Sequence, residues 1–252
     1  TIVTGTIIKG KASINDEIYF PEICAKKVIK DMQMFKKPIQ KAYQGDRVGM
    51  LIKNLDHTKI ERSLACNEGY VQNVSSGIFL LKKIVYYKHE IKSNSKLYLI
   101  IGNQGVNAKC LFFSKASDTP SLYTDFDIGN VQKTSINMKQ FYNSEFVYQE
   151  GLVNNNEDYT FALLKFDNNL LMPPDMIALG SKIDFDVSHK SNRIAFFGKM
   201  IDKHHDDKKL KIFKMKSKAG KILRMVDEKI AVVVSLFKKD SNIDDFIGKT
   251  VT

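Results

Sequence analysis

The sequence has no tryptophan, five prolines and three cysteines among its 252 residues. Cys24, Cys66 and Cys110 are odd in number, widely spaced and never part of a Cys-x-x-Cys pair, which argues against a disulfide scaffold and against a zinc site. We expect all three to be buried thiols in a reducing compartment. The chain also lacks a signal-peptide pattern and any apolar run near the ~18 residues of a membrane span. These absences predict a cytoplasmic protein with no membrane partner.

Signatures of catalysis are missing as well. No Gly-x-x-x-x-Gly-Lys-Ser/Thr phosphate loop occurs, although nucleotide hydrolases commonly use such a loop to hold phosphates with backbone amides. His57, His89 and His189 have no neighbouring nucleophile or paired carboxylate that would suggest acid–base chemistry. The sequence therefore predicts no catalytic residue within this chain.

A charged run, "DKHHDDKK" at residues 202–209, combines imidazole and carboxylate groups that are metal ligands in other proteins. Adjacent residues rarely converge on one ion, and no partner cluster stands elsewhere in the sequence. We interpret the run as a solvated linker and predict no metal site.

Positive charge is abundant. Lys and Arg number 39 against 28 Asp and Glu, which gives a formal net charge of +11. Such a field favours an anionic partner such as nucleic acid, although solubility alone is an alternative.

Short β-branched and aromatic runs alternate with turn residues along the chain, for example "TIVTGTII", "VGMLI", "GIFLL", "KLYLII" and "KIAVVV". This spacing is typical of an all-β protein built from barrels or sandwiches. Only "KTSINMKQFYNSEF" suggests a short helix. Residues 115–158 are rich in Ser, Asp, Asn and Thr and predict a long loop with little core, and domain boundaries are expected near residues 73 and 201.

The most basic segment is residues 208–224, "KKLKIFKMKSKAGKILR", which has eight Lys and Arg and no acidic residue. Read as a hairpin with "SKAGK" as its turn, it places cations on one face because strand side chains alternate. We predict an RNA-contacting ribbon, with a charged edge strand as the alternative. Its candidate RNA-binding residues are Lys209, Lys211, Lys214, Lys216, Lys218, Lys221 and Arg224.

The first 69 residues contain "GTIIKGKASINDEIYF", "VIKDMQMFKKPIQKAYQGDRVGMLI" and "IERSLACNEG". Together these segments resemble the second domain of translational GTPases, a small β-barrel that follows the GTP-binding domain. One departure is Asn15, where that family usually has Gly in a turn. Asparagine also tolerates the left-handed backbone that such a turn needs.

Further segments are "VYYKHEIKSNSKLYLIIGNQGVNAKCLFFS", "FVYQEGL", "IALGSKIDFDV", "NRIAFFG" and "SLFKKDSNIDDFIGKTV". They resemble the eukaryotic selenocysteine-specific elongation factors, and general elongation factors lack the last of them. The resemblance implies tandem β-barrels of domain-two and domain-three type at residues 1–73 and 74–200. It further implies a linker at 201–208 and the beginning of a third β domain, domain four, at 209–252.

By this resemblance, the whole protein delivers selenocysteyl-tRNA to the ribosome at a recoded stop codon. Its other partners would be the recoding-element RNA and the protein that binds that element. GTP and Mg²⁺ would bind a domain upstream of this chain, as would the acidic and histidine members of the family's selenocysteine pocket. Domains two and three would hold the aminoacyl end and acceptor arm of the tRNA.

Only Arg47 carries over from that pocket. A selenol is largely ionised at neutral pH, whereas an unperturbed cysteine thiol has a pKa of ~8.5 and a serine hydroxyl is neutral. A guanidinium therefore stabilises a selenolate and leaves serine with an unmatched cation. General elongation factors usually have Asn at this position. If Val48, Met50 and Ile52 face the core, Arg47 lies on the opposite face; the alternative is an ion pair with its neighbour Asp46.

Two other functions remain open from the sequence. A general elongation or initiation factor would share the first two barrels but lack the "SLFKKDSNIDDFIG" extension. A stand-alone RNA-binding β protein would have no GTPase domain in its gene.

Overall fold

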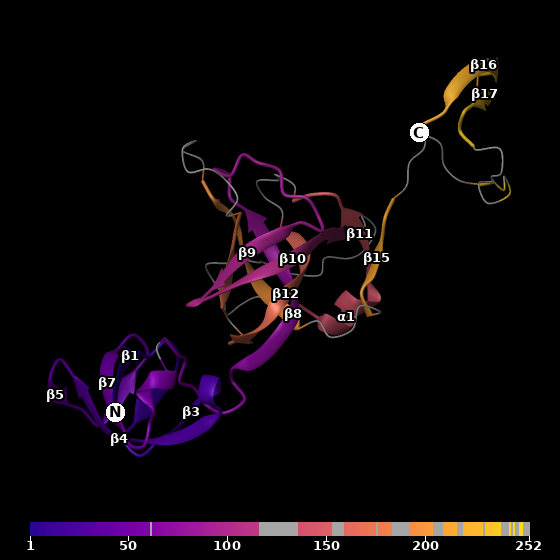
Figure 1. The fold of residues 1–252 in the computed structure, drawn as a ribbon. Coiled ribbons are helices and arrows are strands. Elements are labelled where there is room, and N and C mark those ends of the chain that lie inside the picture. Colours follow the sequence, from indigo (N-terminus) through magenta and orange to yellow (C-terminus); the bar gives the residue numbers. More distant parts are fainter. Residues whose placement is uncertain are drawn as a thin grey trace. The chain divides into compact units, whose positions relative to one another are not determined.

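The fold is all-β, as predicted, and the computed structural model places strands along most of the described chain (Figure 1). Contacts divide it into two compact units, Thr1–Phe213 and Lys214–Thr252. The structure describes residues 1–60, 62–115, 136–152, 159–174, 176–182, 192–203, 209–215, 219–228, 230–237, 242, 244 and 247–248.

The N-terminal strands form two small sheets around one core. Four strands pair in the order β1-β7-β4-β3, β5 pairs with β4, and β2 pairs with β6. Their shared core includes Phe20, Ile29, Met32 and Ile52, each almost completely buried. The strands are β1 (Ile2–Thr6), β2 (Lys11–Ser13), β3 (Glu17–Phe20), β4 (Ala25–Met34), β5 (Lys37–Pro38), β6 (Lys41–Tyr43) and β7 (Arg47–Ile52).

Two turns in this region share one construction. Asn15, which stands where the resembling family usually has Gly, has φ 70°. The left-handed backbone expected at this residue is therefore confirmed. Asp16 Oδ2 accepts a hydrogen bond from the Ser13 amide at 2.7 Å, and Asp46 Oδ2 accepts one from the Tyr43 amide at 2.8 Å. In each turn, an aspartate fixes the backbone three residues before it.

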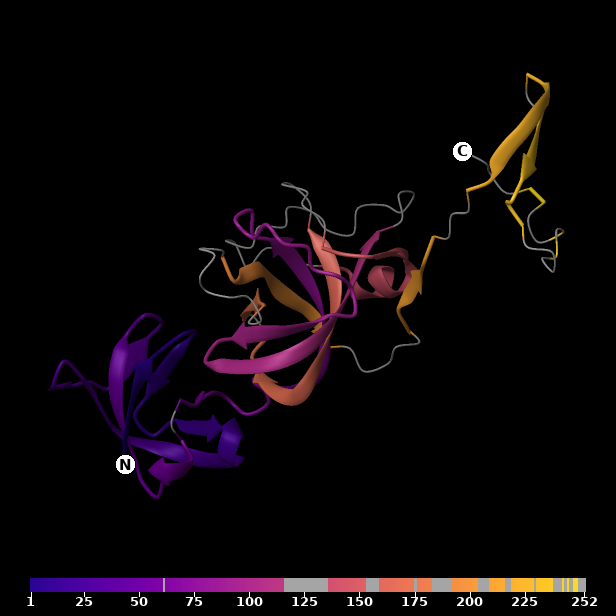
Figure 2. The same ribbon diagram turned by 45° about the horizontal axis from the view of Figure 1, so that its top comes forward.

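A closed barrel follows. Its ring runs β12-β8-β14-β13-β9-β10, and β10 pairs back to β12, so six antiparallel strands close on themselves. Figures 1 and 2 show these strands curving around a common centre. The strands are β8 (Gln72–Lys83), β9 (Lys96–Ile101), β10 (Gln104–Lys115), β12 (Thr160–Met172), β13 (Ile177–Ser181) and β14 (Ile194–Lys203).

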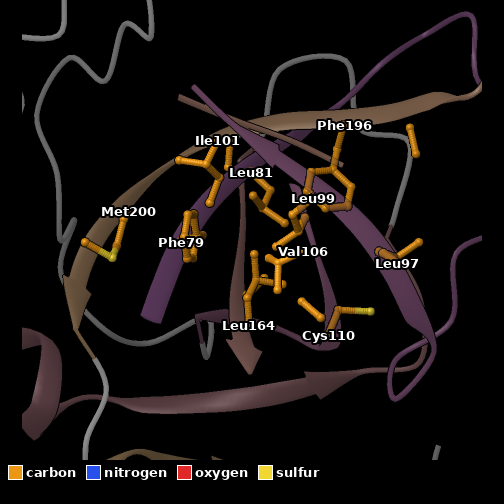
Figure 3. Close-up of a cluster of buried hydrophobic side chains, with 14 of the residues drawn as sticks. Phe79, Leu81, Leu97, Leu99, Ile101, Val106, Cys110, Leu164, Phe196 and Met200 are labelled. Atoms are coloured by element: carbon orange, nitrogen blue, oxygen red, sulfur yellow. The ribbon is translucent and has the colours of Figure 1, made fainter. Parts of the chain in front are cut away.

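The barrel has a core on each side of its wall. On β8, Phe79 and Leu81 point inward, whereas Ile78 and Leu80 point outward, and all four are fully buried. A strand covered on both faces has an uninterrupted apolar sequence, which explains "GIFLL". The inner core, drawn in Figure 3, includes Phe79, Leu81, Leu97, Leu99, Ile101, Val106, Cys110, Leu164, Phe196 and Met200. The outer core contains Ile78, Leu80, Phe113, Phe141, Phe146, Phe161, Leu163 and Leu210.

The outer core corrects the loop predicted at residues 115–158. Helix α1 (Met138–Asn143) and strand β11 (Glu145–Gln149) lie in this segment, and they contribute the fully buried Phe141 and Phe146. The predicted short helix is confirmed. The polar residues around Phe141 and Phe146 suggested a loop, but these two rings pack against the outside of the barrel wall. Residues 116–135 and 153–158 lie outside the described part.

The predicted basic hairpin is wrong. Strand β15 (Lys211–Phe213) pairs in parallel with β11, while β16 (Lys221–Asp227) pairs with β17 (Ile230–Val234). Leu210 is buried in the outer core and Ile212 packs against it, which ties β15 to the barrel. β14 also continues to Lys203, beyond the linker start predicted at 201. The boundary near residue 73 stays a prediction.

The cysteines and the helix lengths test two further expectations from the sequence. The cysteines are free, but only Cys110 is buried; Cys24 is exposed, so the expectation of three buried thiols is wrong. Cys24 is the residue that ends the short 3-10 turn Pro21–Ile23, with φ 49°. Over the described residues, no helix has the length and apolar character that a bilayer span requires.

Candidate functional site

Arg47 is the first residue of β7 and follows a tightly fixed turn. Gly45 has φ 94°, a conformation that side chains disfavour. The Gly45 amide donates to the Ile7 carbonyl, and the Ile7 amide donates to the Asp46 carbonyl, both at 2.9 Å. The turn is thus anchored to the segment after β1, so the start of β7 has a defined position.

The strand then presents Arg47 outward. Val48 and Ile52 are buried and Met50 packs against their core, whereas Arg47 is exposed. The predicted alternation is confirmed. The Asp46 carboxylate accepts from the Tyr43 amide, and among the described residues no ion pair joins it to Arg47. The alternative interpretation of Arg47 as one half of a turn ion pair receives no support.

The neighbours of Arg47 on the same face are small and polar. Thr6 lies directly opposite it in the β1–β7 register, and Thr4 lies opposite Gly49. A Cβ added at Gly49 would be in ordinary van der Waals contact with Ile2 and Thr4, at 3.8 and 3.9 Å, so a small side chain would fit there without a clash. Arg47 therefore lies beside two exposed threonines and a residue without a side chain. Sequence reasoning missed Thr4, Thr6 and Gly49, although strand alternation combined with the β1–β7 pairing identifies them.

The candidate RNA-binding residues do not form one ribbon. Lys209 and Lys211 belong to the first unit, where Lys211 lies opposite Glu145 in the β15–β11 register. Lys214, Lys221 and Arg224 belong to the second unit, and all five are exposed. Lys216 and Lys218 lie outside the described residues. An RNA-binding role for this set stays a prediction.

The other candidate groups for chemistry are thiols and potential metal ligands. Burial raises the pKa of the Cys110 and Cys66 thiols, which keeps both protonated and weakly nucleophilic. Within the described ranges, no group of three or more His, Cys, Asp or Glu side chains is arranged to hold a metal ion. His204 and His205 lie outside those ranges.

The fold is that of a translation elongation factor. Crystal structures of elongation factor SelB from Methanococcus maripaludis, in the apo form and with the GTP analogue GppNHp, align with TM-scores of 0.71 and 0.70. Each alignment covers 94% of this chain and 46% of the SelB chain, at 22% identity. At that identity, the similarity defines the class of fold.

Sequence comparison identifies the family. A model of the third domain of eukaryotic selenocysteine-specific elongation factors matches residues 78–198, and a model of the eEFSec C-terminal RIFT domain matches residues 208–252. The chain belongs to the selenocysteine-specific elongation factor family.

Two relatives carry that name. The selenocysteine-specific elongation factor of Mus musculus is 28% identical over 271 residues, covering 100% of this chain and 46% of the relative. The factor of Methanocaldococcus jannaschii is 31% identical over 104 residues, covering 40% of this chain and 22% of its own length. The chain thus spans about half the length of the mouse relative.

Proposed function

We propose that this chain supplies the β-barrel part of a factor that binds selenocysteyl-tRNA and delivers it to the cytoplasmic ribosome at a recoded stop codon. The observation that carries the proposal is the match of two domain models of one family to consecutive parts of the chain. GTP and Mg²⁺ would bind a separate domain of the same protein, which supplies hydrolysis. The recoding-element RNA and its binding protein would be further partners.

Within this function, Arg47 is the residue that recognises selenium. Arg47 is exposed on the face that also carries Thr4, Thr6 and Gly49, and no carboxylate among the described ion pairs neutralises it. A selenolate brings the matching negative charge, whereas the neutral hydroxyl of a serine ester does not. The rigid turn at Gly45 and Asp46 fixes the direction from which this cation approaches the aminoacyl group.

The test compares the affinities of the full-length factor for one tRNA charged with selenocysteine or with serine. Arg47→Ala should reduce the preference for selenocysteine by about 5-fold to 150-fold, the loss of one charge-assisted contact of ~1 to 3 kcal/mol. Arg47→Lys should retain part of the preference because the charge remains. Lys53→Ala, which removes an exposed cation just after β7, is the matched control and should leave the preference unchanged.

Equal loss of both affinities in Arg47→Ala would assign the residue to the tRNA backbone. A wild-type protein without preference for either aminoacyl group would refute the proposed function itself. That second outcome would favour a general elongation factor or a stand-alone RNA-binding protein.

A further inference from the structure

The turn that leads into Arg47 has a twin elsewhere in the N-terminal region. Residues 43–46 form the turn before β7, and residues 13–16 form the turn before β3; we call them the β7 turn and the β3 turn. In each, the amide of the final aspartate donates to the carbonyl of the first residue, at 3.0 and 3.1 Å. The aspartate carboxylate accepts from the amide of that first residue, at 2.8 and 2.7 Å. The third residue is left-handed in both, Gly45 with φ 94° and Asn15 with φ 70°.

Each turn is also attached to the strand that pairs with the one it leads into. The β7 turn exchanges two backbone hydrogen bonds with Ile7, which follows β1, and both measure 2.9 Å. The β3 turn exchanges two with Ile29 of β4, at 2.8 and 3.0 Å. Because β1 pairs with β7 and β4 pairs with β3, the same set of bonds fixes the first residue of each strand, Arg47 in β7 and Glu17 in β3.

The two first residues differ in their charge partners. Glu17 forms an ion pair with Lys26 of β4, at 3.8 Å. Lys26 lies diagonally across the β3–β4 register from Glu17, and Thr4 lies at the same diagonal from Arg47 in the β1–β7 register. Diagonal neighbours are within reach of long side chains. A neutral threonine therefore stands where the twin has a residue of opposite charge, and none of the described ion pairs includes Arg47.

The carboxylate next to Arg47 in the sequence is occupied by the turn. Asp46 Oδ2 accepts from the Tyr43 amide, and the Asp46 amide and carbonyl are both hydrogen-bonded. An aspartate that is held in a turn in this way has one orientation, directed at the backbone three residues before it. The charge that could most easily neutralise the guanidinium is thus kept on the turn.

We propose that Asp46 is a positioning residue that holds Arg47 as an unpaired cation at the start of β7. Asp46 does not contact the aminoacyl group; it fixes the turn with its carboxylate and thereby leaves the guanidinium available to an anionic ligand. The inference rests on the proposed function for the identity of that anion, a selenolate.

The first test compares the affinities of the full-length factor for one tRNA charged with selenocysteine or with serine. Asp46→Ala should reduce the preference for selenocysteine by about 2-fold to 10-fold, the range that one hydrogen bond corresponds to. Asp46→Asn should restore the preference, because an amide oxygen can accept the same hydrogen bond from Tyr43.

The twin turn provides the matched control. Asp16→Ala removes the same hydrogen bond from the β3 turn, so it should lower Tm by about 1 to 4 °C, as Asp46→Ala does. It should leave the preference for selenocysteine unchanged. A purely structural role for Asp46 would make the two variants alike in both measurements.

A second test needs no RNA. Phenylglyoxal modifies free guanidinium groups, and mass spectrometry of the 252-residue chain reports the rate at Arg47. Asp46→Asn should leave this rate unchanged, because the Asp46 carboxylate does not pair with the guanidinium. Thr4→Glu supplies a carboxylate at the diagonal position and should slow the rate by up to about 5-fold, the effect of an exposed ion pair. Thr4→Gln has a similar shape without the charge and should not slow it.

Three outcomes would overturn the proposal: an unchanged preference in Asp46→Ala, an equal loss of preference in Asp16→Ala, or faster modification of Arg47 in Asp46→Asn. A wild-type factor without preference for selenocysteine would instead refute the proposed function. The modification rates would in that case still decide whether Asp46 leaves the guanidinium unpaired.

Discussion

The closed barrel and the β16–β17 pair contain similar apolar side chains but bury them very differently. In β8, four consecutive residues from Ile78 to Leu81 are 0% exposed. In β16, every residue is exposed, and Leu223 is 66% exposed. A two-stranded ribbon has no interior, whereas six paired strands enclose one. Burial in this protein therefore depends on closure of the sheet rather than on local hydrophobicity.

The largest expected effect is on the free energy of unfolding. It is tested by truncating one apolar side chain in the barrel and one in the β16–β17 pair. Phe141→Ala removes a fully buried ring from the outer core, where it lies 4.7 Å from the Phe146 ring between centroids, and should lower the free energy of unfolding by about 3 to 5 kcal/mol. Leu223→Ala should change the free energy of unfolding by less than ~0.5 kcal/mol. Urea unfolding followed by circular dichroism measures both, and comparable losses would show that β16 is covered in solution.

A smaller effect concerns how closely the barrel strands pack. Gly198 of β14 is buried, and a Cβ there would overlap the Leu80 carbonyl oxygen and lie 3.0 Å from Leu81 Cα. Gly198→Ala should therefore lower Tm, with a destabilisation of about 1 to 3 kcal/mol. Gly5→Ala is the matched control in a strand, because nothing lies within 4 Å of its added Cβ. If calorimetry gave the same Tm for both variants, the close approach of β14 to β8 would be in doubt.

The smallest expected effect is on stability at alkaline pH. Tyr142 of α1 donates a hydrogen bond to Asp202 Oδ2 of β14 at 2.7 Å, and burial together with this carboxylate raises the pKa of Tyr142 well above its usual value. A raised pKa means that the hydrogen bond stabilises the fold fully below the usual tyrosine pKa of ~10 and that this stabilisation is lost as pH rises further.

Tyr142→Phe should therefore cost about 1 kcal/mol near neutral pH and flatten the fall in stability above pH ~10. Tyr86→Phe, at a residue that is 80% exposed, should leave both quantities unchanged. Urea unfolding at several pH values gives the comparison. An unaltered alkaline slope in Tyr142→Phe would contradict the role of this bond in attaching α1 to the barrel.

Much of the fold was predictable because it depends on local signals. The apolar runs located the strands, Asn15 adopted the left-handed turn, and the alternation around Val48 placed Arg47 on the exposed face. Resemblance supplied the family, which the two domain models match, whereas the predicted domain bounds stay a prediction. These features depend on residues that are close together in the chain.

Long-range pairing could not be predicted in the same way. The turn residues in "SKAGK" suggested a hairpin, yet β15 pairs with β11, about 65 residues earlier in the chain, because Leu210 and Ile212 complete the outer core. Phe141 and Phe146 lie in a polar segment whose composition resembles a loop. Their burial follows from the barrel wall against which they pack.

The candidate site likewise has features that follow from local sequence and features that follow from long-range pairing. The sequence by itself determined the strand content, the exposed orientation of Arg47, the basic net charge and the resemblance to an elongation factor, because each of these depends on side-chain type and short-range spacing. Only the tertiary structure decided that Thr6 lies opposite Arg47 and that Thr4 lies opposite Gly49 on the same face. The physical reason is register: hydrogen bonding between distant strands chooses which residues face one another, and no local pattern specifies that choice.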